Sequence, residues 1–327
     1  MKIIFTGAGE FGVPTLRALS RAHEVSLAIT QPDRPAGRRR APRATPIGSE
    51  AGALGIETVK TGKANEAAVV ERVASEGADA MVVVAFGQFL SQALVNAPRL
   101  GSLNLHASLL PRWRGASPIN AAILAGDPET GNSTMRLVKE MDAGAILGQQ
   151  SLPIDPRETA GELHDRLAAL GVDLVLNTLE GLAAGRIAAL EQDEGEATFA
   201  PKLSKADGWV DFGADAKSVR CRVHGLTPWP GAAVTWTPSG RASEPHRLLL
   251  RRVEESPDFA HDEAPGTLLT GAGLIACGSG AIRVLEVQPA GKKAMDWGAF
   301  ANGHNPTPGE RFVSEQPPPT EGGALAG

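Results

Sequence analysis

MKIIFTGAGEFG, residues 1–12, joins an apolar run to glycines at positions 7, 9 and 12. An apolar strand that ends in a glycine-rich turn before a helix is typical of the first βαβ unit of an α/β fold. Asp33 follows about 20 residues later, where a dinucleotide-binding fold carries an acidic residue for a ribose hydroxyl. The glycines therefore have two interpretations, a dinucleotide site or only a tight turn from strand to helix.

Outward from this stretch, the first half of the chain alternates between strand-like and helical segments. Residues 24–30 (EVSLAIT) and 79–86 (DAMVVVAF) are strand-like, and helical patterns occupy 14–22 and 65–77. Strands separated by helices form parallel sheets through right-handed crossovers. We therefore expect an α/β fold with a Rossmann-like, doubly wound parallel sheet.

The pattern changes after a long helical stretch at 158–185. A polar, weakly periodic segment follows, and beyond it short β-rich runs are separated by Gly, Pro and Asn, as in a small barrel or sandwich. The last residues have almost no apolar side chains to bury. We expect a catalytic N-terminal domain at 1–189, a linker at 190–207, a smaller C-terminal β-barrel domain at 208–313 and a disordered tail at 314–327.

Composition excludes several classes of protein. A hydrophobic content of 42% suits a globular chain, and no apolar run approaches the roughly 18 residues of a membrane span. The start of the chain lacks the pattern of a secretory signal, so we expect a cytoplasmic protein. Two cysteines, Cys221 and Cys277, and scattered histidines predict reduced thiols and no metal site.

Arginines gather in one Pro- and Gly-rich segment, residues 32–43 (PDRPAGRRRAPR), although the formal net charge is −5. That net charge argues against a protein that coats nucleic acid non-specifically. We expect the segment to be a flexible, strongly positive loop. It is either a solvated run of charge or an arm that binds phosphates, because the planar fork of arginine fits a phosphate group.

Residues 102–108 (SLNLHAS) indicate a strand with one polar face. Side chains alternate along a strand, so Ser102, Asn104, His106 and Ser108 share that face. Strands of a parallel sheet are normally apolar on both faces, and open α/β sheets bind ligands at the carboxyl ends of their strands. The polar face therefore predicts a cleft. His106 alone would be interpreted as a buried structural histidine, but the neighbouring asparagine adds a donor for an oxyanion.

Asp142 lies in MDAGAIL (141–147), beyond a strand-like run. It either forms the turn before Gly144 or places a carboxylate beside His106, where it would orient the ring and favour its protonated form. Ser108 lacks the glycine elbow that presents a nucleophilic serine. Asn, His and Asp without an attacking Ser or Cys indicate acyl transfer in which the substrate is its own nucleophile.

Residues 104–119 (NLHASLLPRWRGASPI), followed by MDAGAIL, resemble the 10-formyltetrahydrofolate-dependent formyltransferases, and the resemblance covers roughly residues 1–313. It implies the formyltransferase fold with an OB-like C-terminal barrel, and 10-formyltetrahydrofolate as co-substrate, with neither NAD nor a metal. It implies a catalytic set of Asn104, His106 and Asp142. The residues that it implies for folate binding are Phe86, Gly87, Ser108, Leu109, Leu110 and Pro111.

Three further stretches resemble the members of this family that act on initiator tRNA: QPDRPAGRRR (31–40), TPWPGAAVTW (227–236) and QPAGKKAM (288–295). This implies transfer of the formyl group to the free α-amine of methionyl-initiator tRNA by a monomer that needs no membrane. It also implies that the arginine-rich loop contacts the tRNA, with Arg38 foremost, through Arg34, Arg38, Arg39 and Arg40. A weaker implication is a basic face on the barrel formed by Lys202, Lys205, Arg247, Lys292 and Lys293.

Three other interpretations compete with this one. A nicotinamide oxidoreductase would explain the glycines and Asp33 but neither the polar strand nor the arginines. A non-catalytic RNA-binding protein would need only the basic loop and the barrel. A formyltransferase that acts on an amino sugar or a purine precursor is the nearest alternative. Purine-precursor enzymes of this family generally lack the C-terminal domain, and sugar-specific ones need not carry the arginine loop.

Overall fold

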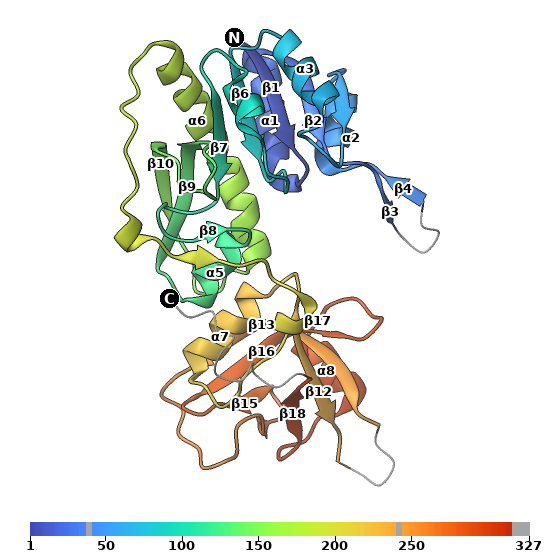
Figure 1. Cartoon of the computed structure of the whole chain (residues 1–327). Coiled ribbons are helices and arrows are strands. Elements are labelled where there is room, and N and C mark those ends of the chain that lie inside the picture. The colour runs from blue at the N-terminus through green and yellow to red at the C-terminus, as the bar shows by residue number, and fades with distance from the viewer. Residues whose placement is uncertain (37–40, 240–243, 316–327) are drawn as a thin grey trace. The chain divides into compact units, whose positions relative to one another are not determined.

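The computed structural model describes residues 1–36, 41–239 and 244–315, and the chain divides into two compact units (Figure 1). The first unit comprises Met1–Gly115, Thr130–Leu152 and His164–Phe199. The second comprises Ala116–Glu129, Pro153–Leu163 and the residues from Ala200 onward. The segment expected as a linker is therefore divided, since its residues up to Phe199 belong to the first unit.

A seven-stranded sheet with the order β10-β9-β7-β6-β1-β2-β5 forms the centre of the first unit. Its first five strands along the chain pair in parallel, and β9 pairs antiparallel with β7. This confirms a mixed α/β fold with a mainly parallel central sheet. The strands are β1 (Lys2–Gly7), β2 (Glu24–Thr30), β5 (Thr58–Lys60), β6 (Ala80–Val84), β7 (Ser102–His106), β9 (Glu129–Arg136) and β10 (Ile146–Pro153).

Helices link these strands and bury their apolar faces against the sheet. Val69, Val73 and Leu94 of two such helices join a buried cluster with Ile4 and Met81 of the sheet. The burial of such side chains is the main favourable contribution to folding. The helices of this unit are α1 (Val13–Ala22), α2 (Pro46–Ala53), α3 (Ala67–Ser75), α4 (Gln92–Asn96) and most of α6 (Ala160–Ala183).

Helix α6 lies on the apolar face of β7. A Cβ atom at Gly171 would come within 2.7 Å of the end of the Leu105 side chain, so the glycine leaves room for this leucine against the helix. Leu105 thus points toward α6. Because side chains alternate along a strand, Asn104 and His106 occupy the opposite face of β7. This is the face that we expected to be polar.

The glycine-rich turn after β1 serves close packing. A Cβ atom at Gly7 would lie 2.6 Å from the carbonyl oxygen of Val84, and one at Gly12 would lie 3.1 Å from Phe5. At Gly9 a Cβ atom would meet only an ordinary contact at 3.5 Å. Asp33 forms an ion pair with Lys60 at 2.8 Å. Packing between β1, β6 and the following 3-10 helix (Glu10–Gly12) accounts for two of the three glycines without a bound phosphate.

In the arginine-rich segment, which the sequence predicts as a flexible, strongly positive loop, two short strands pair with each other. Strand β3 (Arg34–Ala36) pairs antiparallel with β4 (Ala41–Arg43), so that Arg34 lies opposite Arg43 (Figure 1). Proline lacks an amide hydrogen, but it is tolerated in edge strands, and both strands here are edges. Arg38, Arg39 and Arg40 lie outside the described residues.

The second unit is built on a curled antiparallel sheet in the order β14-β15-β16-β13-β12-β18. The large buried side chains of Trp236, Phe300 and Phe312 fill its interior. The strands are β12 (Ala232–Thr237), β13 (His246–Ser256), β14 (Leu268–Thr270), β15 (Leu274–Ala276), β16 (Ala281–Pro289), β17 (Met295–Asp296), which pairs with β16, and β18 (Arg311–Ser314). The helices are α5 (Pro118–Leu124), α7 (Ala216–Gly225) and α8 (Trp297–His304).

Backbone hydrogen bonds join the first and last strands of this order. The N–H of Leu268 donates to the carbonyl of Glu310, and the N–H of Phe312 donates to the carbonyl of Gly266, each at 2.8 Å. Strand β18 runs to Ser314, one residue beyond the expected end of the C-terminal domain, and residues 316–327 of the expected tail lie outside the described residues. Across the described ranges, no helix combines the length and the apolar character that crossing a membrane requires.

Candidate functional site

His106 and Asp142 meet at the carboxyl end of β7. The imidazole Nδ1 lies 3.6 Å from Oδ2 of Asp142, and Nε2 lies 2.9 Å from the carbonyl oxygen of Trp113. His106 is only 6% exposed. Both ring nitrogens thus face oxygen acceptors in a largely dry environment.

Asn104 shares the face of β7 with His106 and lies two residues before it along the strand. Its side chain is half-buried. Within residues 1–36, 41–239 and 244–315, its side-chain amide has no hydrogen-bond partner, and no contact joins it to His106 or Asp142. A half-buried amide without a partner of its own chain has both of its hydrogens available for a ligand.

The loop that carries Asp142 has an unusual backbone. Asp142 has a φ of 52°, in the left-handed region that few residues other than glycine adopt. The N–H of Gly115 donates to its Oδ2 at 2.8 Å. Gly144 follows, where a Cβ atom would lie 1.9 Å from the carbonyl oxygen of Arg136. The two interpretations of Asp142 are therefore compatible, since it lies in a tight turn and also faces His106.

A second chain segment holds this loop, and sequence reasoning missed it. Nε2 of Gln192 donates to the carbonyls of Asp142 and Gly144, at 2.7 and 2.8 Å. Its Oε1 accepts from Nε of Arg114 at 2.9 Å. Gln192 lies in the segment predicted as a linker, because that segment is polar and weakly periodic. The only hint in the sequence was Arg114, a cation within the apolar surroundings of the 104–119 motif.

The segment from Ser108 to Pro111 forms a fixed turn after β7. Ser108 is fully buried, and its hydroxyl donates to the carbonyl of Arg112 at 2.6 Å. The hydroxyl of Ser133 donates to the carbonyl of Ser108 and accepts from the N–H of Leu110. Leu110 is also buried, whereas Leu109 and Pro111 are half-buried. Only these two side chains of the turn are open to a ligand.

Phe86 and Gly87 follow β6, the neighbour of β7 in the sheet. Phe86 is buried in the apolar cluster beneath the sheet edge, and its carbonyl accepts from Nε2 of Gln31 at 2.6 Å. Gly87 is exposed and has a φ of 73°. Gln31 also accepts from the exposed Arg34 at 2.5 Å, so the base of the β3–β4 hairpin is tied to the end of β6.

The remaining candidate residues are the predicted tRNA-binding arginines, possible metal ligands and the two cysteines. Arg38, Arg39 and Arg40 lie outside the described residues. Arg247 forms an ion pair with Glu315 at 2.7 Å. Among the described residues, no three His, Cys, Asp or Glu side chains gather as a metal site would require. Burial raises the pKa of the Cys221 and Cys277 thiols, that of Cys277 to about 12, so neither is a nucleophile near neutral pH.

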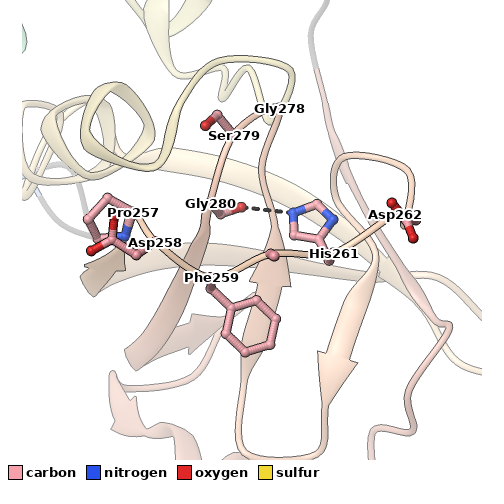
Figure 2. A pocket seen from close by; sticks show the side chains of 9 residues that line it. Pro257, Asp258, Phe259, His261, Asp262, Gly278, Ser279 and Gly280 are labelled. Carbon is pink, nitrogen blue, oxygen red and sulfur yellow. Dashed lines mark hydrogen bonds between the residues drawn. The ribbon is translucent and has the colours of Figure 1, made fainter.

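A cavity of about 490 Å³ lies in the second unit. It is lined by the loop after β13, Pro257 to Asp262, and by the turn from Gly278 to Gly280 (Figure 2). Nε2 of His261 lies 2.9 Å from the carbonyl oxygen of Gly280. None of the predicted catalytic or binding residues lines this cavity.

Comparison with known families identifies two matching domains in the chain. Residues 1–179 match the formyl transferase family, and residues 202–305 match the formyl transferase C-terminal domain. The chain therefore belongs to the formyl transferase family.

Its relatives with curated descriptions carry a more specific name. Methionyl-tRNA formyltransferase of Solibacter usitatus is 42% identical over 314 residues, which span 95% of this chain and 98% of that protein. The enzyme of the same name from Methylococcus capsulatus is 42% identical over 93% of this chain and 97% of that protein.

Solved structures share the fold at lower identity. The sugar 3N-formyl transferase WlaRD, crystallised with dTDP and 5-N-formyl-THF, has a TM-score of 0.62 at 14% identity over 90% of this chain and 99% of that chain. HypX from Aquifex aeolicus, in complex with tetrahydrofolic acid, has a TM-score of 0.61 at 18% identity. That likeness covers 93% of this chain and 47% of HypX.

Proposed function

We propose that this chain transfers the formyl group of 10-formyltetrahydrofolate to the α-amine of methionyl-initiator tRNA. The observation that carries this proposal is the His106–Asp142 pair at the end of β7, beside an asparagine amide that has no intramolecular partner among the described residues. The near-full-length likeness to methionyl-tRNA formyltransferases supports the choice of acceptor.

In this mechanism the side chains stabilise charge and the amine supplies the electron pair. The amine attacks the formyl carbon, and the side chains of Asn104 and protonated His106 donate hydrogen bonds to the oxyanion that develops. Asp142 keeps the imidazole oriented and balances its charge. The bond between the formyl carbon and N10 of the folate then breaks, its electron pair stays on N10, and N10 takes a proton while the amine loses one.

The predicted folate residues fit this role in two different ways. Leu109, Pro111 and Gly87 present accessible surface at the carboxyl ends of β7 and β6. Phe86, Ser108 and Leu110 are buried, so we expect them to shape the turn and to offer main-chain atoms. Gly87 has a positive φ, which glycine adopts without strain.

We assign tRNA binding to the arginine-rich segment, with Arg34, Arg38, Arg39 and Arg40 as contacts to phosphates. The exposed β3–β4 hairpin, with Arg34 opposite Arg43, supports this assignment because it presents guanidinium groups on a narrow, two-stranded support. Its tie to the end of β6 through Gln31 connects it to the edge of the sheet that carries the candidate site.

We also propose a Rossmann-like, doubly wound sheet in a catalytic domain at 1–189 and an OB-like, tRNA-binding barrel at 208–313. The packing of α1 against α2 and of α3 against α4 supports the first assignment. The hydrogen bonds that join residues 266–268 to 310–312 support a barrel. We further propose that the protein acts in the cytoplasm as a monomer.

A formyl-transfer assay with two amine acceptors tests this function. The purified chain is incubated with 10-formyltetrahydrofolate and either methionyl-initiator tRNA or a dTDP-linked amino sugar. We expect formylmethionyl-tRNA and no formylated sugar, and we expect His106→Ala to abolish the product. Transfer to the sugar but not to the tRNA would overturn the proposal.

A further inference from the structure

We propose that Gln192 is a positioning residue for formyl transfer, which holds the Asp142 loop so that the carboxylate faces His106. This inference rests on the function proposed above. It assigns a role in the reaction to a residue of the presumed linker, more than 45 positions along the chain from the nearest predicted catalytic residue, Asp142.

The side-chain amide of Gln192 is fully used. Its nitrogen donates to two main-chain carbonyls, those of Asp142 and Gly144, and its oxygen accepts from Arg114. Only a primary amide offers two donor hydrogens and an acceptor oxygen in one plane. Glutamate at this position would keep the acceptor for Arg114 but would face the two carbonyls without a hydrogen to give.

The loop needs such an anchor because its backbone is strained. A non-glycine residue at a positive φ costs on the order of 1–3 kcal/mol and persists only where the surroundings impose it. Gln192 binds the carbonyl of Asp142 itself and that of Gly144, so it acts on peptide groups within this turn. The N–H of Gly115 holds the carboxylate, and Gln192 holds the backbone that carries it.

Arg114 connects these two anchors. It is 3% exposed and stands between Trp113, whose carbonyl faces His106, and Gly115, whose N–H faces Asp142. The contacts therefore form a closed ring that runs from His106 through the 113–115 segment to Gln192, then to Asp142 and back to His106. Loss of the Gln192 amide opens this ring next to the carboxylate.

The other contacts of the same segment do not reach Asp142. Leu190 and Ile146 exchange two backbone hydrogen bonds, which are independent of the side chain at position 192. Glu191 is exposed, and no hydrogen bond or ion pair joins its side chain to another described residue. Glu191→Ala is therefore a matched control, because it alters the residue beside Gln192 and leaves the contacts of the Asp142 loop in place.

The test compares the Gln192→Leu, Gln192→Glu and Glu191→Ala variants with the unaltered chain. We expect both Gln192 variants to lower kcat about 10- to 100-fold, as small displacements of catalytic groups do, with both KM values within about twofold. Amide hydrogen exchange should show lost protection at residues 142–146 in these variants only. Glu191→Ala should match the unaltered chain in both measurements.

A double-mutant cycle separates positioning from a general loss of structure. In an Asp142→Ala background, Gln192→Leu should lower the residual kcat by less than about twofold, because the group that it positions is absent. Equal losses in both backgrounds, or unchanged kcat and exchange in the single variants, would overturn the inference. The rate of the unaltered chain with methionyl-tRNA tests the proposed function separately. Should that rate be zero, the exchange measurement still decides whether Gln192 holds the loop.

Discussion

The N–H of Gly115 and the imidazole of His106 share one carboxylate oxygen, Oδ2 of Asp142, at 2.8 and 3.6 Å. The main chain therefore fixes this oxygen of the carboxylate beside the imidazole. The mechanism proposed above needs this arrangement, because a fixed negative charge orients the ring without becoming a proton acceptor itself.

Replacement of Asp142 by asparagine tests the charge separately from the shape. Asp142→Asn keeps an oxygen for the Gly115 N–H but removes the charge beside His106. We expect kcat to fall about 100-fold or more, because the imidazole loses the charge that orients it and balances its protonated form. Folate binding, measured by titration calorimetry with a 10-formyltetrahydrofolate analogue, should stay within about twofold. An active Asp142→Asn enzyme would contradict the role given to this carboxylate.

Replacement of Asn104 should lower activity without lowering the stability of the fold. Asn104→Ala removes an oxyanion donor, which typically costs about 10²–10³ in turnover. Because its amide has no partner among the described residues, the free energy of unfolding should change by less than about 0.5 kcal/mol. Single-turnover formyl transfer and urea unfolding measure the two quantities. A large loss of stability would show that the asparagine is mainly structural.

The arginine-rich segment should act on tRNA alone. We expect Arg38→Ala to raise the KM for methionyl-tRNA and to reduce the slope of log Kd against log salt by about 1, as the loss of one phosphate contact does. Binding of the folate analogue should be unchanged. Arg21→Ala is the control, since Arg21 is an exposed arginine at the end of α1. Equal losses for tRNA and folate would argue against a tRNA-binding segment.

Acid should destabilise the second unit through His224. Burial, together with the nearby cations Arg220 and Arg252, lowers the pKa of this fully buried imidazole to about 4. Its Nε2 accepts from the N–H of Val253, a hydrogen bond that protonation would break. The unfolded chain, with a histidine pKa near 6.5, binds a proton first as the pH falls, so stability is lost progressively below about pH 6.5.

The free energy of unfolding should fall by roughly 3 kcal/mol as the pH approaches 4, because of the lowered pKa of His224. Urea unfolding between pH 7.5 and pH 4.5 measures it, and His224→Gln should show a shallower decline. Glu162 does not interfere in this window. Burial raises the pKa of its carboxyl, but hydrogen bonds from Arg252 and Thr159 outweigh burial and lower it to about 2. The stability that the ionised Glu162 carboxylate contributes to the folded state is therefore lost only below about pH 4.5. Parallel curves for the two proteins would contradict the prediction.

Two glycines of the opening stretch provide a matched pair. Gly7→Ala places a Cβ atom 2.6 Å from the Val84 carbonyl and should destabilise the chain by about 1–3 kcal/mol, as overpacking does. Gly9→Ala has room at 3.5 Å and a φ of −81°, so stability and formyl transfer should stay near those of the unaltered chain. Thermal unfolding compares them. Sensitivity at Gly9 with tolerance at Gly7 would revive the dinucleotide interpretation.

Much of the first unit follows from sequence pattern. Apolar runs at regular intervals predicted β1, β2 and β6, and the polar face of 102–108 predicted the strand that carries Asn104 and His106. The approach of Asp142 to His106 was one of two open interpretations, because spacing along a chain does not determine how a loop folds back. The resemblance to a family selected between them.

The remaining features depend on tertiary contacts that sequence does not display. Ser108 and Phe86 belong to motifs expected to bind folate, but their side chains are buried, since packing decides which members of a motif face outward. The β3–β4 hairpin has prolines in both strands, which argued against strands in the sequence. Gln192 carried no signal at all, because a single polar residue in a polar segment has no periodicity.

Positions 113 and 115 serve the catalytic pair through a carbonyl and an amide, groups that nearly every amino acid carries. Their φ values are 59° and 117°, so these positions require an unusual backbone conformation, whereas their contacts require no particular side chain. Position 192 has the reverse requirement, because its contacts depend on one particular side chain. Substitutions at positions 113 and 115 should therefore be limited by the backbone conformation that they must adopt. Substitutions at position 192 should be limited by the chemistry of the side chain.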